Sequence, residues 1–261
     1  YTAETLFPYT TLFRSLTINA PRKRATRYLI TALSALLPIG AGVVILHWQA
    51  EHTLQQSTAQ TAQEAVRQFD LMLDNTALAA QALLPLAGQP CDNTVKLALR
   101  EQVTRRPFVR ATTLSWQKNI YCSSLFGGGY ESPVNPDDYV DGRLWLMNGN
   151  PVTPGTALLV YRLVDGDKGA FASIDGYHLS NALRLISHNA DLVLQVGPHW
   201  MGADGKVRDS ALPVFAVAHH HLASTRYGYS VDAGMPAGEI WRYMQDRYPA
   251  LFILVGFFGA L

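Results

Sequence analysis

The chain has 261 residues, with 21 lysines and arginines against 20 aspartates and glutamates and a formal net charge of +1. Because a face that binds nucleic acid needs an excess of basic residues, this balance argues against nucleic acid as a partner. The length allows one or two domains with a hydrophobic core, and the apolar residues, 48% of the total, are spread unevenly along the sequence.

Residues 1–15 do not fit the pattern of a folded segment. No methionine precedes Met72, so we expect the natural start of the protein to be missing. Residues 5–15, TLFPYTTLFRS, resemble the direct translation of a common short-read sequencing adapter. We therefore expect residues 1–15 to be an artefactual scar and exclude them from the interpretation of fold and function.

Residues 29–48, LITALSALLPIGAGVVILHW, predict a transmembrane helix, because about 20 predominantly apolar residues are needed to cross the hydrocarbon core. The preceding segment, residues 16–28, contains the basic residues Arg22, Lys23, Arg24 and Arg27. By the positive-inside rule, residues 16–28 are then cytoplasmic and the chain after Trp48 lies outside. A cleaved signal peptide is the alternative, but its apolar region would be shorter and would end in a small-x-small site.

A second apolar run, residues 250–261, ALFILVGFFGAL, ends the sequence. It is about half as long as a spanning helix and follows a group of aromatic residues of the kind found at membrane interfaces: Trp241, Tyr243 and Tyr248. We expect it to be the start of a second, truncated transmembrane helix. A buried C-terminal core helix is the alternative.

Residues 49–249, between the two apolar runs, predict an α+β domain outside the membrane. Residues 49–86 contain no glycine or proline before Pro85, and their apolar residues keep a helical spacing, so a long helix is expected to continue out of the membrane. A second helix over residues 95–103 is expected, with Asp92 as its N-cap. A short amphipathic helix is expected around residues 179–186.

After Pro107 the sequence changes to short β-rich runs separated by glycine, proline, asparagine and aspartate. The expected strands are residues 109–116, 120–123, 144–147, 157–163, 170–174, 191–196, 214–218 and 227–231. Asn119 and Gly205 are typical hairpin positions. A long helix followed by an antiparallel sheet and a short covering helix resembles the PAS-like extracytoplasmic sensor domains of bacterial receptors, and this analogy suggests sensing.

Both cysteines, Cys91 and Cys122, lie in the segment expected outside the membrane. The bacterial periplasm is oxidising, so an even pair of cysteines there most often forms a disulfide. Such a bond would join the loop after the long helix to the end of the second strand. A redox-sensing pair and a plain stabilising disulfide both fit the sequence.

Cys122, Ser123 and Ser124 form a C-S-S triplet, with Cys91 upstream and a predicted span on either side. This combination resembles the CSS-motif input domain of membrane-bound, EAL-type cyclic-di-GMP phosphodiesterases. In that family the domain lies between two spans and precedes a cytoplasmic EAL catalytic domain. The resemblance implies a bacterial inner-membrane protein in which the redox state of Cys91 and Cys122 controls the enzyme, with periplasmic thiol-disulfide oxidoreductases as partners.

The same resemblance implies a homodimer in the lipid bilayer and a Mg²⁺ or Mn²⁺ ion in the EAL domain. This sequence contains no E-A-L motif, so no catalytic residue and no cofactor is assigned to this chain. The alternative function is a ligand-binding periplasmic sensor domain of a chemoreceptor, histidine kinase or diguanylate cyclase. Aromatic residues that would line such a pocket, or pack in the core, are Trp116, Tyr121, Trp145, Tyr161 and Trp200.

Two further clusters are weighed for ligand binding. On a strand, His219 and His221 share a face, and Asp232 is expected near them across a hairpin. No further ligand is evident, so we interpret them as a solvated or core cluster and assign no metal. The run Gly127-Gly128-Gly129 lacks the spacing of a phosphate loop, and we interpret it as a flexible loop near the cysteine pair.

Overall fold

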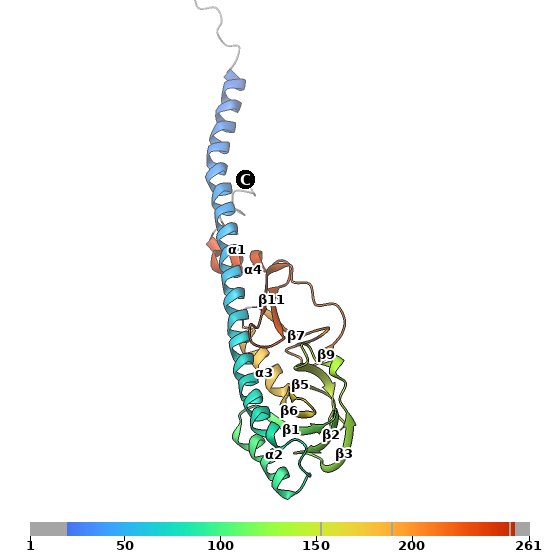
Figure 1. Cartoon of the computed structure of the whole chain (residues 1–261). Helices are drawn as coiled ribbons and strands as arrows, with labels where there is room; N and C mark the ends of the chain where they lie inside the picture. Colours follow the sequence, from blue (N-terminus) through green and yellow to red (C-terminus); the bar gives the residue numbers. More distant parts are fainter. Residues whose placement is uncertain (1–19, 152, 189, 251, 254–261) are drawn as a thin grey trace, which may run out of the picture.

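One long helix lies along the molecule, and the other elements pack beside its second half. The structure, a computed structural model, describes residues 20–151, 153–188, 190–250 and 252–253. Helix α1 (Ala20–Leu83) has 64 residues and continues into a short 3₁₀ turn, η1 (Leu84–Leu86), as Figure 1 shows. The long helix expected over residues 49–86 is thereby confirmed.

Helix α2 (Asn93–Arg105) reverses the direction of the chain after α1. Asp92 is its N-cap, as expected, and Asp92 Oδ1 accepts a hydrogen bond from Val95 N at 2.9 Å. This bond satisfies one of the N–H groups that have no partner in the first turn of a helix. Gly88 lies in the turn between the two helices with a φ of 90°, a value that glycine adopts without strain.

The first sheet has six antiparallel strands in the order β3-β2-β1-β6-β5-β4. The strands are β1 (Val109–Trp116), β2 (Asn119–Ser123), β3 (Gly127–Pro133), β4 (Leu144–Gly149), β5 (Pro154–Asp165) and β6 (Lys168–Asp175). Gln117 and Lys118, with φ of 51° and 65°, make the tight turn between β1 and β2, because two-residue hairpin loops favour positive φ. A 3₁₀ turn, η2 (Pro136–Asp138), separates β3 from β4.

The second sheet has five strands in the order β10-β11-β7-β8-β9. The strands are β7 (Asp191–Val196), β8 (His199–Gly202), β9 (Val207–Arg208), β10 (Val217–Ala223) and β11 (Ser230–Met235). Helix α3 (Gly176–Ile186) connects the sheets, and α4 (Glu239–Arg247) follows β11. The α+β class is confirmed, with the strands divided between two sheets where the sequence suggested one.

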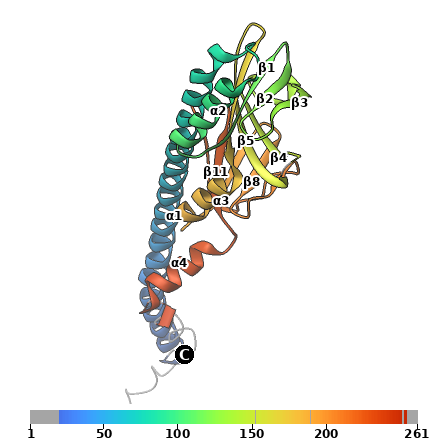
Figure 2. The same ribbon diagram turned by 90° about the horizontal axis from the view of Figure 1, so that it is seen from below.

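The buried face of α1 forms the core of the domain. It packs against β1, β5 and β6 of the first sheet and against β10 and β11 of the second. Ala65, Phe69 and Leu73 are fully buried at the helical spacing that the sequence predicted, and burial of a large apolar side chain contributes roughly 1.5 to 3 kcal/mol. Figure 2 shows the same arrangement from below, with α1 beside both sheets.

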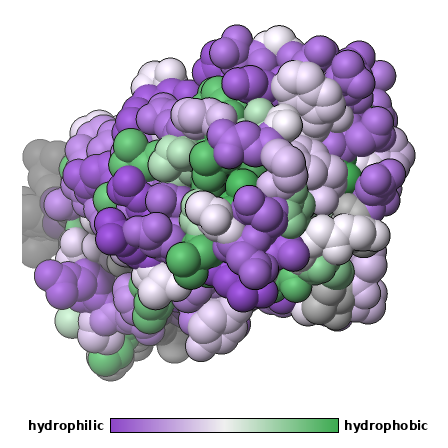
Figure 3. All heavy atoms as spheres, turned by 60° about the horizontal axis from the view of Figure 1, so that its bottom comes forward, coloured by the Kyte–Doolittle hydropathy of each residue, from purple (hydrophilic) through white to green (hydrophobic). Residues whose placement is uncertain are grey.

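The first part of α1 projects beyond the domain (Figure 1). Its apolar side chains are exposed, among them Leu29 at 65%, Leu37 at 68% and Ile45 at 61%. By length and composition, α1 is the one helix among the described residues that could cross a membrane. No part of its most apolar stretch is buried. The opposite end of the molecule is mostly hydrophilic, with smaller hydrophobic areas (Figure 3). This asymmetry fits a bilayer at one end and water at the other.

Helix α4 returns the chain to α1 just after this exposed stretch. The rings of Trp241 and His47 lie 5.7 Å apart, and Met244 is fully buried. The chain therefore leaves the domain beside the point where α1 joins it. The expected second span, residues 250–261, lies outside the described residues except for positions 250, 252 and 253, and the scar expected at residues 1–15 lies outside them entirely.

Six of the expected strands are confirmed, and two are displaced along the sequence. The strand expected at residues 214–218 begins at Val217, because Val214 lies in an exposed loop. The strand expected at residues 227–231 begins at Ser230. The alternation of Tyr227 and Tyr229 resembled a strand, but both hydroxyls bind α1 before the strand begins. Strands β3, β8 and β9 were not expected.

A polar cluster joins α1 to the turn before β11. Arg226 Nη1 donates to Asp74 Oδ2 at 2.8 Å, and Tyr227 Oη donates to Asp74 Oδ1 at 2.6 Å. One turn earlier on α1, Asp70 Oδ1 accepts a hydrogen bond from Tyr229 Oη at 2.7 Å. Burial raises the pKa of Asp74, but the hydrogen bonds from Arg226 and Tyr227 and the charge of Arg226 outweigh it, so this pKa lies below its usual value of 3.8.

The lowered pKa of Asp74 predicts a specific loss of stability in acid. A carboxyl whose pKa falls on folding stabilises the folded state above its unfolded pKa, and that contribution disappears as the pH drops through the lower, folded value. Asp74→Asn should therefore reduce the free energy of unfolding at pH 7, and its difference from the wild type should shrink as the pH falls below about 3.8. Urea titrations between pH 7 and pH 2.5 measure this, and a difference that stays constant over the whole range would contradict it.

Candidate functional site: the disulfide and the C-S-S motif

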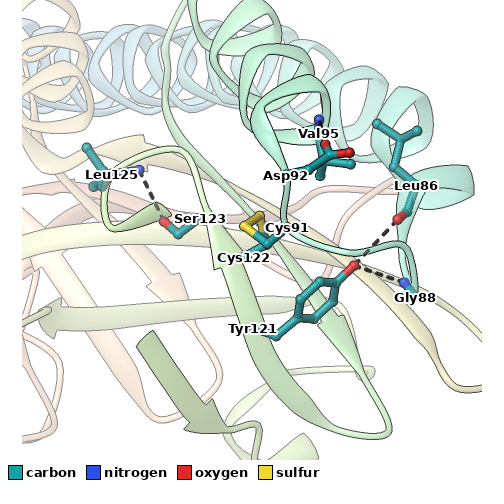
Figure 4. The surroundings of a disulfide bond; sticks show 9 residues. All are labelled: Leu86, Gly88, Cys91, Asp92, Val95, Tyr121, Cys122, Ser123 and Leu125. Carbon is teal, nitrogen blue, oxygen red and sulfur yellow. Dashed lines mark hydrogen bonds between the residues drawn. A yellow bond between two sulfur atoms is a disulfide. The ribbon is translucent and has the colours of Figure 1, made fainter. Parts of the chain in front are cut away.

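The two cysteines form a disulfide where the chain passes from α1 to α2. Cys91 and Cys122 are 31 residues apart in sequence, with Cα atoms 5.5 Å apart. Cys91 directly precedes the N-cap of α2, and Cys122 lies on β2 (Figure 4). Cys122 is fully buried, whereas Cys91 is half-buried. The bond therefore joins the loop between α1 and α2 to the first sheet, and Cys91 is its partly exposed residue.

Strand β3 lies directly against this bond and corrects one interpretation of the sequence. The run Gly127-Gly128-Gly129 was expected to be a flexible loop, but it begins β3, where Gly128 pairs with Cys122. A Cβ placed on Gly128 would lie 3.4 Å from both Cβ and Sγ of Cys91. These are ordinary van der Waals distances, so Gly128 packs directly against Cys91 and β3 lies in contact with the disulfide.

Tyr121 makes a second connection between β2 and the end of α1. Its hydroxyl accepts a hydrogen bond from Gly88 N at 2.9 Å and donates to Leu86 O at 3.4 Å (Figure 4). Burial raises the pKa of Tyr121, and the hydrogen bond from Gly88 opposes this more weakly, so the phenol stays protonated at neutral pH. The loop between α1 and α2 is thus held to β2 by one covalent bond and by the hydroxyl of Tyr121.

The three residues of the C-S-S motif have different structural roles. Cys122 points into the core, and Ser123, next along the strand, points to the other face of the sheet. Ser123 Oγ accepts a hydrogen bond from Leu125 N at 3.2 Å and so closes the turn after β2. Ser124 Oγ accepts from Thr112 N at 3.0 Å, and Ser124 N donates back to Thr112 O at 2.9 Å. Both serines make the backbone hydrogen bonds expected at a strand end.

The histidine cluster has the arrangement expected from strand alternation. His219 Nε2 lies 2.9 Å and His221 Nδ1 lies 3.0 Å from Asp232 Oδ1, on the neighbouring strand. Asp232 is buried, while both histidine side chains are about half exposed. Within the described part of the chain, no group of three or more His, Cys, Asp or Glu residues has a geometry that could hold a metal ion. The cluster therefore connects β10 to β11 by hydrogen bonds.

The five aromatic residues considered for a pocket do not come together. Trp145 alone among them lines the cavity on the outer face of the first sheet, where Tyr139 and Phe171 accompany it. Tyr161 lines a different hollow beside Tyr227, and Trp200 donates its indole N–H to Ser210 O. Tyr139 and Phe171 were missed because the sequence gives no sign that they meet Trp145.

The fold and the site define a disulfide-bonded α+β domain that packs beside a helix extending well beyond it. The model of one family, described as the CSS motif domain associated with EAL, matches residues 54–247. This chain belongs to that family. The match includes both cysteines and confirms the resemblance that the C-S-S triplet indicated.

Two relatives from Escherichia coli (strain K12) carry the name of a probable cyclic di-GMP phosphodiesterase. PdeD is 31% identical over 104 residues, which are 40% of this chain and 19% of PdeD. PdeG is 24% identical over 213 residues, which are 80% of this chain and 40% of PdeG. The chain therefore matches less than half of the length of either relative.

Among solved structures, an extracellular ligand binding receptor from Desulfohalobium retbaense is similar with a TM-score of 0.47 and 11% sequence identity. That similarity covers 71% of this chain and 41% of the receptor.

The two serines of the motif are expected to differ in their contribution to stability. Ser124→Ala removes the acceptor of the buried Thr112 N–H, and an unsatisfied buried donor costs about 1 to 3 kcal/mol. Ser123→Ala removes an acceptor at Leu125, which is 46% exposed, so water replaces it and the cost stays below about 1 kcal/mol. Urea unfolding of the two variants with the disulfide intact measures this difference. Equal losses, or a greater loss for Ser123→Ala, would contradict the assigned roles.

Proposed function

We propose that this chain is the periplasmic, redox-responsive input region of a membrane-bound cyclic-di-GMP phosphodiesterase. Membership of the CSS-motif family and the names of the two relatives support the class of enzyme. The observation that carries the redox role is the Cys91–Cys122 disulfide, which joins the loop between α1 and α2 to the first sheet and has Cys91 partly exposed. Hydrolysis, and the Mg²⁺ or Mn²⁺ ion that supports it, belongs to an EAL domain outside this chain.

The proposed location is the bacterial inner membrane. The exposed apolar part of α1 spans the bilayer, the basic residues at positions 22–27 remain in the cytoplasm, and the domain lies in the periplasm. Helix α4 brings the chain back beside α1, so a second span from residue 250 would enter the bilayer next to the first. A signal from the domain then reaches two adjacent membrane helices.

We propose that the protein acts as a homodimer with α1 at the interface. On the solvent-facing side of α1, Leu71 and Leu78 are 50% and 43% exposed and lie one heptad apart. Residues seven apart share one stripe of a helix, which is the geometry of a helix-to-helix contact between subunits. A change in the position of α1 would then alter the pairing of the cytoplasmic domains.

The redox step is a thiol-disulfide exchange with a periplasmic dithiol oxidoreductase. A thiolate of the reductant attacks Cys91 Sγ, because Cys122 is fully buried, and the Sγ–Sγ bond breaks with Cys122 as the leaving thiolate. The second thiol of the reductant then attacks the mixed disulfide and releases Cys91. Two electrons and two protons pass to this chain, which ends with two thiols, and the reductant ends as a disulfide.

Reduction would loosen the junction between α1 and the first sheet. In the chain-entropy model, a disulfide closing a loop of this size stabilises the fold by roughly 3 to 4 kcal/mol. Without it, Tyr121 still joins β2 to Leu86 and Gly88 through its two hydrogen bonds. The loop from Leu84 to Asp92 then has a second arrangement within reach, and a shift between two arrangements is the signal that α1 transmits.

Thiol labelling in intact cells tests the location and the redox change together. A maleimide that does not cross the inner membrane should label Cys91 in cells lacking the periplasmic oxidation system and should fail to label it in wild-type cells. Labelling of Cys122 should be slower, because this residue is fully buried. Labelling that is identical in the two strains would contradict a redox role, and labelling only after lysis would contradict the topology.

Phosphodiesterase activity tests the link to output. In inner-membrane vesicles carrying the natural full-length protein, Cys91→Ser with Cys122→Ser should fix the activity at the level of the reduced wild type, whatever the redox buffer. Ser123→Ala keeps both cysteines and should still respond to the buffer. Cyclic-di-GMP hydrolysis in oxidised and reduced buffers measures this, and a double variant that still responds to the buffer would contradict the proposal.

A further inference from the structure

The outer face of the first sheet contains a cavity that the redox mechanism does not use. The cavity has a volume of 450 Å³ and lies on the side of the sheet away from α1. Its floor is made by small side chains of the central strands, and its sides by aromatic ones. The small residues of the floor are Ala111, Thr113 and Ser173, and the aromatic residues of the sides are Tyr139, Trp145 and Phe171.

The shape follows from the residues that alternate along the strands. Ala111 on β1 pairs with Ser173 on β6, and such directly opposed residues share a face of the sheet. Two small side chains side by side leave a hollow, and the larger Phe171 stands next to it. The turn that carries Tyr139 covers one side of this face, where it packs with Val160 and Phe171 in a small apolar cluster. Volumes of about 300 to 1,000 Å³ with mostly apolar walls are typical of small-molecule sites.

The charge around the cavity favours one class of ligand. Asp138 is the one charged side chain among the described residues that line it, and no Lys, Arg or His is among them. Asp138 is exposed, and its Oδ1 accepts a hydrogen bond from Asn135 Nδ2 at 3.1 Å. Arg162, whose guanidinium donates to Gly142 O and lies 5.4 Å from the centre of the Tyr139 ring, keeps its positive charge but is not among the residues that line the cavity. The Asp138 carboxylate is therefore the charge that a ligand meets in the described lining, where it would attract a cation and repel an anion.

The cavity shares a strand with the disulfide. Ser123 lines the cavity, and its neighbour Cys122 points to the opposite face of β2, where it is bonded to Cys91. Ser123, Thr113 and Phe171 lie in one row across β2, β1 and β6. A ligand pressing on this row contacts the strand that holds the disulfide.

We propose that this cavity binds a small aromatic molecule carrying one amine, with the ring between Trp145, Tyr139 and Phe171 and the ammonium group at Asp138. Occupancy and the redox state of Cys91–Cys122 are linked through β2, so each changes the equilibrium of the other. The inference builds on the proposed redox function, which concerns the disulfide, and adds a second input to the same region.

Binding of two indoles of opposite charge tests the cavity in the purified oxidised protein. Tryptamine should bind with a dissociation constant at least ~10-fold lower than that of indole-3-acetate, because reversing the ligand's charge beside a carboxylate turns Coulomb repulsion into attraction, which is worth about one such factor. Asp138→Asn should remove most of this difference. Calorimetry measures both constants, and equal binding of the two indoles, or no binding of tryptamine at millimolar concentration, would overturn the proposal.

Filling the cavity gives the matched control. Ala111→Leu adds carbon atoms to the floor of the cavity and should weaken the binding of tryptamine at least ~10-fold. Ala82→Leu is the same change at an exposed position of α1, and it should leave the binding of tryptamine unchanged. Circular dichroism confirms that both variants fold. If Ala111→Leu folds and binds tryptamine like Ala82→Leu, the site is elsewhere and the proposal fails.

The link to the disulfide is tested on the same binding signal. Tryptamine affinity should differ by at least ~3-fold between the oxidised protein and the Cys91→Ser, Cys122→Ser double variant. Equal affinities would overturn the link through β2. These binding measurements do not depend on phosphodiesterase activity, so a failure of the cavity proposal and a failure of the redox proposal are distinguishable.

Discussion

The burial of one face of α1 between two sheets is the constraint on which the rest of the structure depends. The same helix continues, without a break in the described residues, from the exposed apolar stretch to the junction with α2. Phe69 and Leu73 hold it to the core, and Asp70 and Asp74 hold it to the turn before β11. In the proposed mechanism, a displacement at one end of this helix is carried along its length toward the exposed apolar stretch.

The disulfide lies at one end of this helix, in the loop that leads to α2. It closes the loop at the end of α1 remote from the exposed apolar stretch, and Tyr121 supports the same loop from β2. The motif serines belong to this arrangement and need no catalytic role, because Ser124 joins β2 to β1 and Ser123 closes the following turn. Gly128 completes it by pairing with Cys122 and lying in contact with Cys91. The C-S-S triplet is thus a way to place one cysteine rigidly inside a sheet.

The sequence predicted the parts of this structure that depend on local pattern. Asp92 as N-cap and the helical spacing of Ala65, Phe69 and Leu73 could be recognised because caps and amphipathic faces are local signals. Strand β3 could not, since three glycines have low strand propensity and pair only because β2 and the cysteine segment are beside them.

Long-range contacts account for the remaining errors. Tyr227 and Tyr229 alternate like strand residues, yet their hydroxyls reach residues of α1 more than 150 positions earlier. The cavity was missed for the same reason, because Tyr139, Trp145 and Phe171 belong to separate elements and meet only when the sheet forms. Hairpin signals predict neighbours that are adjacent in sequence, but residue spacing does not predict which distant elements meet.

Hydrogen exchange of the oxidised and reduced protein tests the central claim, that the state of the disulfide is read by α1. The account predicts that reduction speeds exchange not only at the start of α2 and in residues 121–128 but also along α1 from Val66 to Leu83, while β7 and β8 keep their protection. Faster exchange confined to the residues around Cys91 and Cys122, with α1 unchanged, would show that the bond is a local brace and would contradict the claim.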